Sequence, residues 1–465
     1  MNGSSVLGKV WISKNFNDET VSFLKDNFNL SEIVSKLIAI RNIKIDEVNL
    51  FLKPKIKNLL PNPFVLKDME KAVNRTISAI KNNEKIGIFG DYDVDGATST
   101  ALLGNYFNDI NQKIEIYIPD RKTEGYGPSI QGFQRLISDG SKLIFTVDCG
   151  TLSFDTIEFS QKKNTDVLVL DHHQSELSLP NAFSIVNPNR YDDNSNLNYL
   201  CAAGVCFMFL VGLNRKLREI NWFSENKINE PNLMNYLDLV SLGTVCDVVP
   251  LVGLNRALVS QGLETLKKKS NLGIKTLKNI CGIETNLNTY HLGYIIGPRI
   301  NAGGRVGKCS HGANLLISRD SKEIFKIASE LETYNKERKL IENNMLKKIE
   351  SSIVIDTNEP VIVLSGHNWH GGIIGIVAAR IKEKYNKPTV IISVEKGLGR
   401  ASARSVVGFD IGTLIISAVQ NNILKKGGGH KMAGGFSIEE EKIEEFKHFI
   451  INKFLKIKKN LIESD

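Results

Sequence analysis

Between residues 86 and 186, short apolar runs alternate with segments that have a helical pattern. The runs are rich in Val, Ile, Leu and Phe, which is typical of strands buried on both faces. They lie at 86–89, 114–118, 143–147, 167–170 and 183–186. Helical stretches separate most of them. This alternation predicts an α/β domain whose five-stranded, mostly parallel sheet is covered by helices on both faces.

The segments before and after this region have other patterns. Residues 1–75 show helical spacing broken by prolines, which predicts a small N-terminal helical cap rather than a sheet domain. The main domain then extends over 76–319. A charged amphipathic pattern over 320–352 predicts a long connecting helix.

A second, smaller α/β domain is predicted over 353–440. Its apolar runs at 360–364 and 388–392 have the composition of strands, and 371–380 between them has the pattern of a helix. Residues 441–465 are rich in Glu and Lys and predict a helical tail with a solvated face.

Polar side chains follow four consecutive strands of the first domain at the points where the strands end. In order along the chain they are Asp91, Asp93 and Asp95, then Asp120 and Arg121, then Asp148, then Asp171, His172 and His173. Ligands of open α/β sheets bind beyond the carboxyl ends of the strands. We therefore expect these groups to meet at one edge of the sheet.

Carboxylates gathered at one edge repel each other unless a cation neutralises them. Oxygen ligands suit hard cations such as Mg²⁺, and a histidine nitrogen shifts the preference toward Mn²⁺. The candidate ligands for two divalent cations are Asp93, Asp95, Asp148, His172 and Asp247. The alternatives are an ordinary Asp-capped turn for 91–95, packing for the histidine pair and a satisfied core carboxyl for Asp247.

Composition excludes several classes of protein. The 465 residues exceed the usual size of a single core, and 59 basic against 51 acidic residues give a net charge of +8, a mild preference for polyanions. The six cysteines form no C-x-x-C pair, which argues against a zinc ribbon or a disulfide framework. No apolar run approaches the roughly 20 residues that cross a bilayer, and no signal peptide is expected. We therefore expect a cytoplasmic protein without a membrane partner. A nicotinamide dehydrogenase is disfavoured because no G-x-G-x-x-G follows the first strand.

Six motifs, in this order, resemble those of the DHH phosphoesterase superfamily and, within it, the RecJ family of single-stranded-DNA-specific exonucleases. They are GDYDVDG at 90–96, TVDCG at 146–150, DHH at 171–173, GTVCDVVPL at 243–251, GPRINAGGR at 297–305 and GGGH at 427–430. The resemblance covers roughly residues 30–437. It implies a DHH domain and a DHH-associated domain with a catalytic cleft between them.

The resemblance also implies a function and a ligand set. The function is 5′–3′ hydrolysis of single-stranded DNA by two-metal catalysis, which releases 5′-mononucleotides in DNA repair and recombination. Mn²⁺ would be preferred, with Mg²⁺ as the other candidate. Asp148 would bridge the two cations and Asp91 would be a further ligand. His173, and His430 from the glycine-rich loop, would act at the scissile phosphate.

Substrate contacts carried over from the family involve both domains. Arg305, Ser402 and Arg404 match positions at the 5′ end of the strand, for which arginine forks are suited. The weaker candidates are Arg121, Arg299, Asn301, Gly428 and Gly429. Tyr126 either stacks a base or closes a turn, and the sequence does not separate these two roles.

The implied partner is single-stranded DNA with a 5′ end, together with a single-strand-binding protein and a helicase. RecJ proteins usually continue into an OB-fold, and we expect none within 441–465. Two other functions stay open. One is a DHH-family phosphodiesterase that acts on short oligoribonucleotides or cyclic dinucleotides. The other is a non-catalytic scaffold of DNA replication, which should have lost the metal carboxylates that this chain retains.

Overall fold

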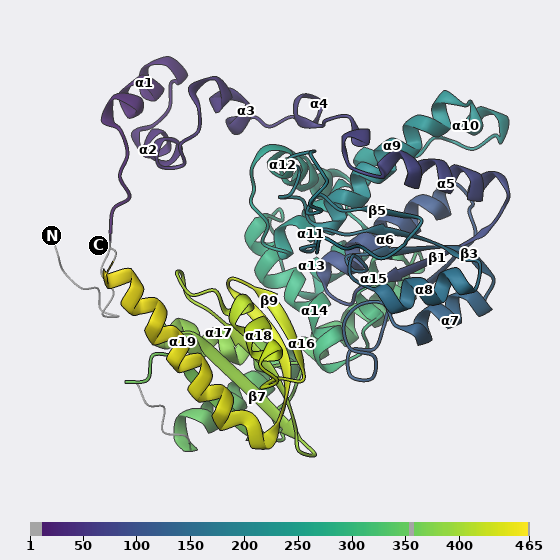
Figure 1. The fold of residues 1–465 in the computed structure, drawn as a ribbon. Helices are drawn as coiled ribbons and strands as arrows, with labels where there is room; N and C mark the ends of the chain where they lie inside the picture. Colours follow the sequence, from purple (N-terminus) through teal and green to yellow (C-terminus); the bar gives the residue numbers. More distant parts are fainter. Residues whose placement is uncertain (1–11, 353–357, 464–465) are drawn as a thin grey trace.

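The computed structural model describes residues 12–352 and 358–463. The first eleven residues of the predicted cap, residues 353–357 at the start of the predicted second domain, and residues 464–465 lie outside the described part of the chain. The described chain contains two sheets joined by one long helix (Figure 1).

The first sheet has five strands, all parallel, in the order β2-β1-β3-β4-β5. They are β1 (Lys85–Gly90), β2 (Ile114–Tyr117), β3 (Ser141–Val147), β4 (Asp166–Leu170) and β5 (Ser184–Val186). Each lies within two residues of a predicted strand. The predicted α/β class and the five-stranded parallel sheet are therefore confirmed.

Helices cover both faces of this sheet because alternate strand residues are apolar on both sides. Ile86 and Ile88 point into a core shared with α5 (Met69–Lys81), α6 (Val94–Asp109) and α9 (Ala202–Glu219). Phe89 and Ile144 point into a core shared with α7 (Ile130–Ser138) and α8 (Phe154–Lys162). Side chains that alternate in direction along a strand produce this two-sided burial.

Further helices extend the first core beyond the sheet. They are α10 (Trp222–Glu225), the 3₁₀-helix η3 (Leu233–Tyr236), α11 (Leu237–Cys246), α12 (Gly253–Lys268), α13 (Leu272–Ile280), the π-helix η4 (His291–Ile296), α14 (Gly297–Val306) and α15 (His311–Ile317). The motif around Asp247 thus lies at the end of a helix, and the motif that contains Arg305 forms α14.

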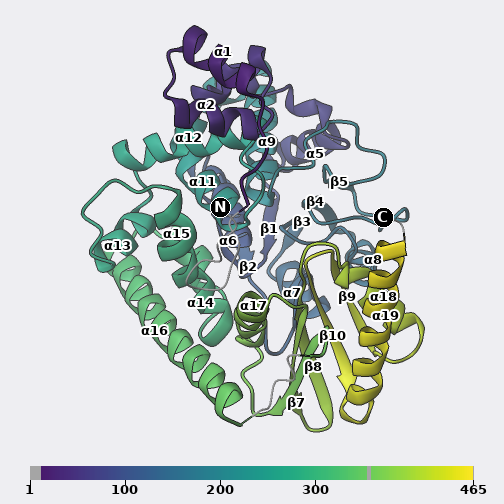
Figure 2. The ribbon, with the colours of Figure 1, turned by 90° about the vertical axis from the view of Figure 1, so that its left-hand side faces the viewer.

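The connecting helix α16 (Ser321–Ser352) is 32 residues long. Its first half contributes Ile324 and Leu331 to the first core, and its second half contributes Met345 and Ile349 to a core of the second unit. Figure 2 shows α16 running from α13 and α15 down to the second sheet. The same helix is therefore packed into both units.

The second sheet has the order β6-β7-β8-β10-β9, with only β6 and β7 parallel. Its elements are β6 (Ile362–His367), α17 (Ile374–Tyr385), β7 (Thr389–Glu395), β8 (Leu398–Arg404), α18 (Ile411–Gln420), β9 (Lys426–His430), β10 (Ala433–Glu439), the 3₁₀-helix η5 (Glu440–Lys442) and α19 (Ile443–Glu463). Helices α17 and α19 lie on opposite sides of this sheet (Figure 2). Phe446 and Ile450 of α19 are buried in the core, so this helix packs as part of the second unit.

One local prediction was wrong. The glycine-rich segment at 427–430 is not a loop but most of edge strand β9, paired with β10 from Lys426↔Ser437 to His430↔Ala433. Gly429 has φ +156, and an added Cβ there would lie 2.4 Å from the Ala433 carbonyl oxygen. Glycine is needed here because the two strands approach too closely for a side chain.

The N-terminal helices form a small separate core. Leu24, Ile38 and Val48 are buried together, away from the main core, and Figure 1 shows α1 and α2 apart from the first sheet. The elements are α1 (Asp18–Phe28), α2 (Glu32–Ile40), the 3₁₀-helix η1 (Ile45–Glu47), α3 (Val48–Leu52), α4 (Ile56–Leu59) and the 3₁₀-helix η2 (Pro63–Val65). The N-terminal core is thus separate from the cores of the two sheets, whereas α19 shares the core of the second, and the predicted five-part division stays a prediction. None of the helices in the described ranges is long and apolar enough to span a bilayer.

Candidate metal centre

The turn between β1 and α6 presents three carboxylates that the backbone holds in place. Asp93 is the N-cap of α6, and its Oδ1 accepts a hydrogen bond of 3.0 Å from the Gly96 N–H. Asp95 accepts bonds of 2.7 and 2.9 Å from the N–H groups of Ala202 and Ala203, where α9 begins. Asp91 is buried beside them. A Cβ on Gly96 would lie 2.6 Å from the Asp91 carbonyl oxygen, so the turn requires glycine there.

His172 lies close to Asp95 and to two carboxylates from other elements, Asp148 and Asp247. Its Nε2 lies 3.3 Å from Asp148 Oδ1, 3.7 Å from Asp95 Oδ2 and 3.7 Å from Asp247 Oδ2. Asp148 follows β3 with φ +60, and Asp247 is the C-cap of α11. A non-glycine residue in the left-handed region is uncommon and tends to mark a functional site. Residues far apart in the sequence thus meet at the carboxyl end of the sheet.

Three groups of side chains place their ligand atoms within 4.8 Å of one another. They are Asp91, Asp93 and Asp148; Asp95, His172 and Asp247; and Asp148, His172 and His173. Asp148 and His172 each belong to two groups. The buried Oδ1 atoms of Asp91 and Asp148 have no hydrogen-bond partner among the described residues. Oxygen-rich donor sets with unsatisfied oxygens fit Mn²⁺ or Mg²⁺, and a carboxylate shared between groups fits a pair of cations.

The electrostatics of the site also favour a cation. Burial, and then the nearby Asp93 and Asp95, raise the pKa of Asp148 well above its usual range. Burial and the same two neighbours raise the pKa of Asp247 to about 8. The Asp247 carboxyl therefore holds a proton at neutral pH unless a cation compensates for its charge, and the charged form of Asp148 is disfavoured in the same way.

Removing the metal should make the stability of the protein depend on pH. In EDTA, we expect the free energy of unfolding to fall by at least about 2 kcal/mol between about pH 5 and pH 8. The folded protein holds protons on carboxyls such as Asp247 in this window, whereas unfolded aspartates, with a pKa near 4, have already lost them. Added Mn²⁺ should restore stability at pH 8. Urea unfolding at several pH values tests this, with Asp247→Asn expected to flatten the profile. A free energy of unfolding in EDTA that did not change with pH would contradict the proposed repulsion between the carboxylates.

Asp171 orients both histidines, a role that the sequence reasoning did not assign to it. Its Oδ1 accepts from the His172 N–H (2.7 Å) and from His173 Nδ1 (2.7 Å), and its Oδ2 accepts from the Thr151 hydroxyl (2.6 Å). Burial alone would raise the pKa of Asp171, but His173, His172 and Thr151 hold it well below its usual range. Burial alone would lower the pKa of His173, but Asp171 raises it to about 9. His173 is therefore a cation at neutral pH.

Two asparagines beyond β5 also hold the histidine segment and were missed. Asn187 donates to the His173 carbonyl at 2.9 Å, and Asn189 donates to the His172 carbonyl. Their only sequence signal was their position after the fifth predicted strand, because an asparagine in a loop is usually part of a turn.

Tyr126 combines a hydroxyl held by hydrogen bonds with an accessible ring, and its role stays a prediction. Its hydroxyl donates to the Asp148 carbonyl at 3.1 Å and lies 3.0 Å from His173 Nε2, while its side chain is 57% exposed. Burial of the hydroxyl, and then Asp148, raise the pKa of Tyr126 well above its usual range. The fixed hydroxyl and the accessible ring suit a base contact beside His173.

Three arginines lie close together between the two sheets. Burial, then Arg121, Arg338 and Arg404, lower the pKa of Arg305 to about 10, and burial and Arg121 lower that of Arg404. Arg305 Nη1 donates to the Gly372 carbonyl at 3.2 Å, and Arg404 Nη1 donates to Ser402 Oγ at 3.3 Å. Arg121 lies over the Tyr92 ring. None of the three arginines forms an ion pair with a carboxylate in the part of the chain described. Mutually repelling arginines without acidic partners fit an anion such as phosphate.

Arg299 has a different environment from the one predicted. Its Nε donates to Glu332 at 2.6 Å and its Nη1 to the Ile295 carbonyl at 2.7 Å, so it joins α14 to α16. We assign it a structural role in place of the substrate contact that the sequence suggested. Asn301 is half-buried on the same helix, one turn before Arg305.

His430 reaches the site from the second unit. Burial, and then His173 and Arg404, lower its pKa, so it is neutral where His173 is charged. Gly428 lies beside it with open space around its Cα, and Gly429 is the close-contact glycine of β9. His430 of the second sheet thus lies near His173, which follows the first sheet. The catalytic roles of these two histidines stay a prediction.

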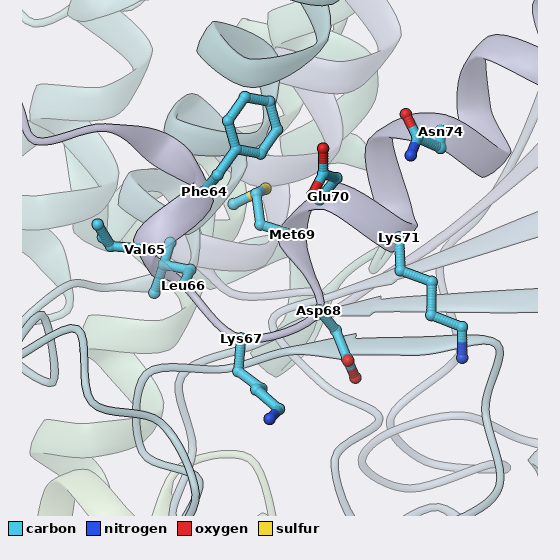
Figure 3. A pocket seen from close by; sticks show the side chains of 9 residues that line it. All are labelled: Phe64, Val65, Leu66, Lys67, Asp68, Met69, Glu70, Lys71 and Asn74. Atoms are coloured by element: carbon cyan, nitrogen blue, oxygen red, sulfur yellow. The ribbon is translucent and has the colours of Figure 1, made fainter.

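A shallow pocket lies elsewhere, in front of α5 (Figure 3), where Lys67, Asp68 and Lys71 line it. Asp68 is already engaged there, since its Oδ2 accepts from Arg190 (2.7 Å) and from the Ile185 N–H (3.3 Å). We assign this pocket no part in the metal site.

Comparison with known proteins identifies the family. The model "DHH family, N-terminal domain" matches residues 85–244, and "DHHA1 domain" matches residues 358–456. The chain is 36% identical over 404 residues to the single-stranded-DNA-specific exonuclease RecJ of Haemophilus influenzae, which covers 84% of this chain and 70% of that protein. It is 31% identical over 442 residues to RecJ of Bacillus subtilis, covering 94% of this chain and 54% of that protein.

A solved structure agrees with these matches. RecJ of Thermus thermophilus in complex with Mn²⁺ superposes with a TM-score of 0.80 at 27% identity, over 95% of this chain and 61% of that one. The present chain thus spans about half to two thirds of the length of some relatives. The matched domains, the identity to curated members and the shared fold show that the chain belongs to the RecJ family of DHH phosphoesterases.

Proposed function

We propose that this protein is a single-stranded-DNA-specific exonuclease that hydrolyses phosphodiester bonds from the 5′ end by two-metal catalysis and releases 5′-mononucleotides in DNA repair and recombination. The observation that carries the proposal is the position of Asp148. It is shared by two ligand groups, and Asp91 and Asp93 of one of these groups lie close to Arg121 and Arg305, which form no ion pair with a carboxylate among the described residues. The names of the relatives supply the substrate, single-stranded DNA.

The arginine cluster accounts for action at an end. Arg305 and Arg404 provide planar forks for the oxygens of a terminal 5′-phosphate, with the Ser402 hydroxyl bonded to Arg404 and with Arg121 close by. A terminal phosphate has more charge and one more free oxygen than a phosphate within a strand. Partly buried arginines that repel one another gain most from the more highly charged group. We therefore propose that the protein selects strand ends.

The two histidines differ in charge, which suits two roles at the scissile phosphate. His173 is cationic at neutral pH and donates a hydrogen bond to a phosphate oxygen, so it stabilises charge that develops in the transition state. His430 is neutral and approaches from the second sheet, where it positions the phosphate from the other side. The two cations, when bound, would activate water and stabilise the leaving oxygen.

The partners follow from the need for a free single strand. Duplex DNA must be opened before a 5′ end is available, so we propose that a helicase and a single-strand-binding protein supply and cover the substrate. We also propose a cytoplasmic location. All six cysteines are free, as is usual in a reducing compartment.

Digestion of end-labelled strands tests the function. With Mn²⁺, a 5′-labelled strand of about 30 nucleotides should release its label at once as a mononucleotide, while a 3′-labelled strand should shorten gradually. EDTA should stop both reactions. Faster hydrolysis of a dinucleotide than of the long strand would instead identify a small-substrate phosphodiesterase, and a labelled duplex cut at the same rate would remove the single-strand specificity.

A further inference from the structure

Two tyrosines stack on each other at the protein surface just before α14. The rings of Tyr290 and Tyr294 have centroids 5.3 Å apart and an interplanar angle of 26°. The residues are 60% and 75% exposed. Two aromatic side chains four residues apart on a helix contact each other, and in many helices such a contact has no role other than to stabilise the helix. Two such large aromatic side chains left open to solvent are, however, also the kind of surface that binds a ligand with a flat face.

The pair lies next to the segment that carries Asp247. Tyr294 belongs to the π-helix η4, which packs on the last turn of α11. Cys246 Sγ donates to the Leu292 carbonyl at 3.4 Å, and a Cβ on Gly293 would lie 3.5 Å from Val245. Directly after Asp247, Val248 has φ +61 and is 84% exposed. A β-branched residue in this conformation is strained, and both such strain and π-helical turns occur preferentially at functional sites.

The helix that follows connects the pair to the arginine cluster. Tyr294 precedes Asn301 by seven residues and Arg305 by eleven, and all three residues are at least partly exposed, so they lie on the side of this helical segment that faces away from the core. The opposite side is buried, with Leu292, Ile296 and Ile300 fully enclosed. At about 1.5 Å per residue, Arg305 and Tyr294 are separated by about 16 Å along the helix axis, the length of a few nucleotides.

We propose that Tyr290 and Tyr294 form a stacking platform for bases of the single strand on the 3′ side of the scissile bond. This rests on the proposed function, in which Arg305 holds the 5′ end. Any base has an aromatic face, so such a platform grips the strand without reading its sequence. It would keep the substrate aligned after each nucleotide is removed. A dinucleotide bound at the arginine cluster would be too short to reach it.

The experiment compares long and short substrates in the full chain. In Tyr290→Ala/Tyr294→Ala, the KM for a 5′-phosphorylated strand of about 20 nucleotides should rise roughly tenfold. The kcat, and the KM for a 5′-phosphorylated dinucleotide, should stay within about twofold of the wild type. Tyr290→Phe/Tyr294→Phe keeps both rings and should restore the KM. The matched control is Phe325→Ala, which removes a ring that is 62% exposed on α16, away from the site.

A second measurement uses modified substrates and maps the contact. A series of strands, each with one abasic nucleotide at a different position, is bound to the wild-type protein in EDTA. Binding should be weaker when the abasic nucleotide occupies one or two adjacent positions, a few nucleotides from the 5′ end. In the double alanine variant this weak position should disappear. A folded double variant with the wild-type KM, or abasic strands that bind equally at every position, would overturn the platform while leaving the exonuclease intact. A wild-type protein that digests no single strand would overturn both proposals.

Discussion

Asp148→Asn is expected to lower kcat on single-stranded DNA by about 10³-fold or more while the fold is kept. Asp148 belongs to two of the three ligand groups, and its Oδ1 lies 3.3 Å from His172 Nε2. Losing this charge removes a ligand from both of the proposed cation positions at once, whereas each of the other carboxylates belongs to one ligand group only. Nuclease assays across a range of Mn²⁺ concentrations measure the effect.

Asparagine is the informative replacement at this position. Asp148 has φ +60, a conformation that asparagine tolerates better than alanine does. The amide also resembles the protonated carboxyl that the metal-free site favours, so the Tm in EDTA should be equal to or above that of the wild type. Asp139→Asn, at an exposed C-cap of α7, is the matched control and should retain full activity. Activity near that of the wild type in Mn²⁺ would rule out a shared ligand.

Arg305→Met is expected to have opposite effects on activity and stability. The KM for 5′-phosphorylated strands should rise about 10- to 100-fold, which corresponds to the loss of a charge-assisted hydrogen bond. The preference over strands with a 5′-hydroxyl should also fall. The Tm without substrate should increase, because burial and the neighbouring arginines oppose the charge of Arg305. Kinetics with the two kinds of 5′ end and thermal unfolding give both readouts.

Arg299→Met, on the same helix, provides the contrast. It leaves Glu332 without its 2.6 Å partner, so the Tm should fall while the preference for a 5′-phosphate is unchanged. If Arg305→Met lowered the Tm as Arg299→Met does, Arg305 would be a structural residue and the anion site would need other ligands.

The parts of the site that could be predicted are those set by local sequence. An apolar run followed directly by Asp91, Asp93 and Asp95 predicts both a strand and the edge of the sheet at which its carboxylates gather. The same reasoning placed Asp148 and His172 at that edge, and the structure brings them to 3.3 Å. The class of fold followed from the same runs, since parallel strands buried on both faces need continuous apolar sequence.

The parts that could not be predicted depend on contacts between distant segments. Strand β9 was taken for a loop because glycines have a low strand propensity, and only its pairing with β10 makes it a strand. Arg299 and Arg305 are six residues apart with the same chemistry, and only the presence of Glu332 on α16 separates their roles. Asp171 was overlooked as a functional group because its two hydrogen-bonded histidines are its own neighbours in the chain.

Helix α16 has a consequence for how this chain tolerates change in length. Because its two halves are buried in different cores, α16 fixes the distance between the two units and their relative rotation about the helix axis. One inserted residue would turn the second sheet by about 100° and shift it by about 1.5 Å, which would carry His430 away from His173. An insertion of a whole number of helical turns would preserve the rotation but would still displace the second sheet along the helix axis. We therefore expect insertions to be tolerated in the surface loops and not in α16, whose length determines the spacing between the two histidines.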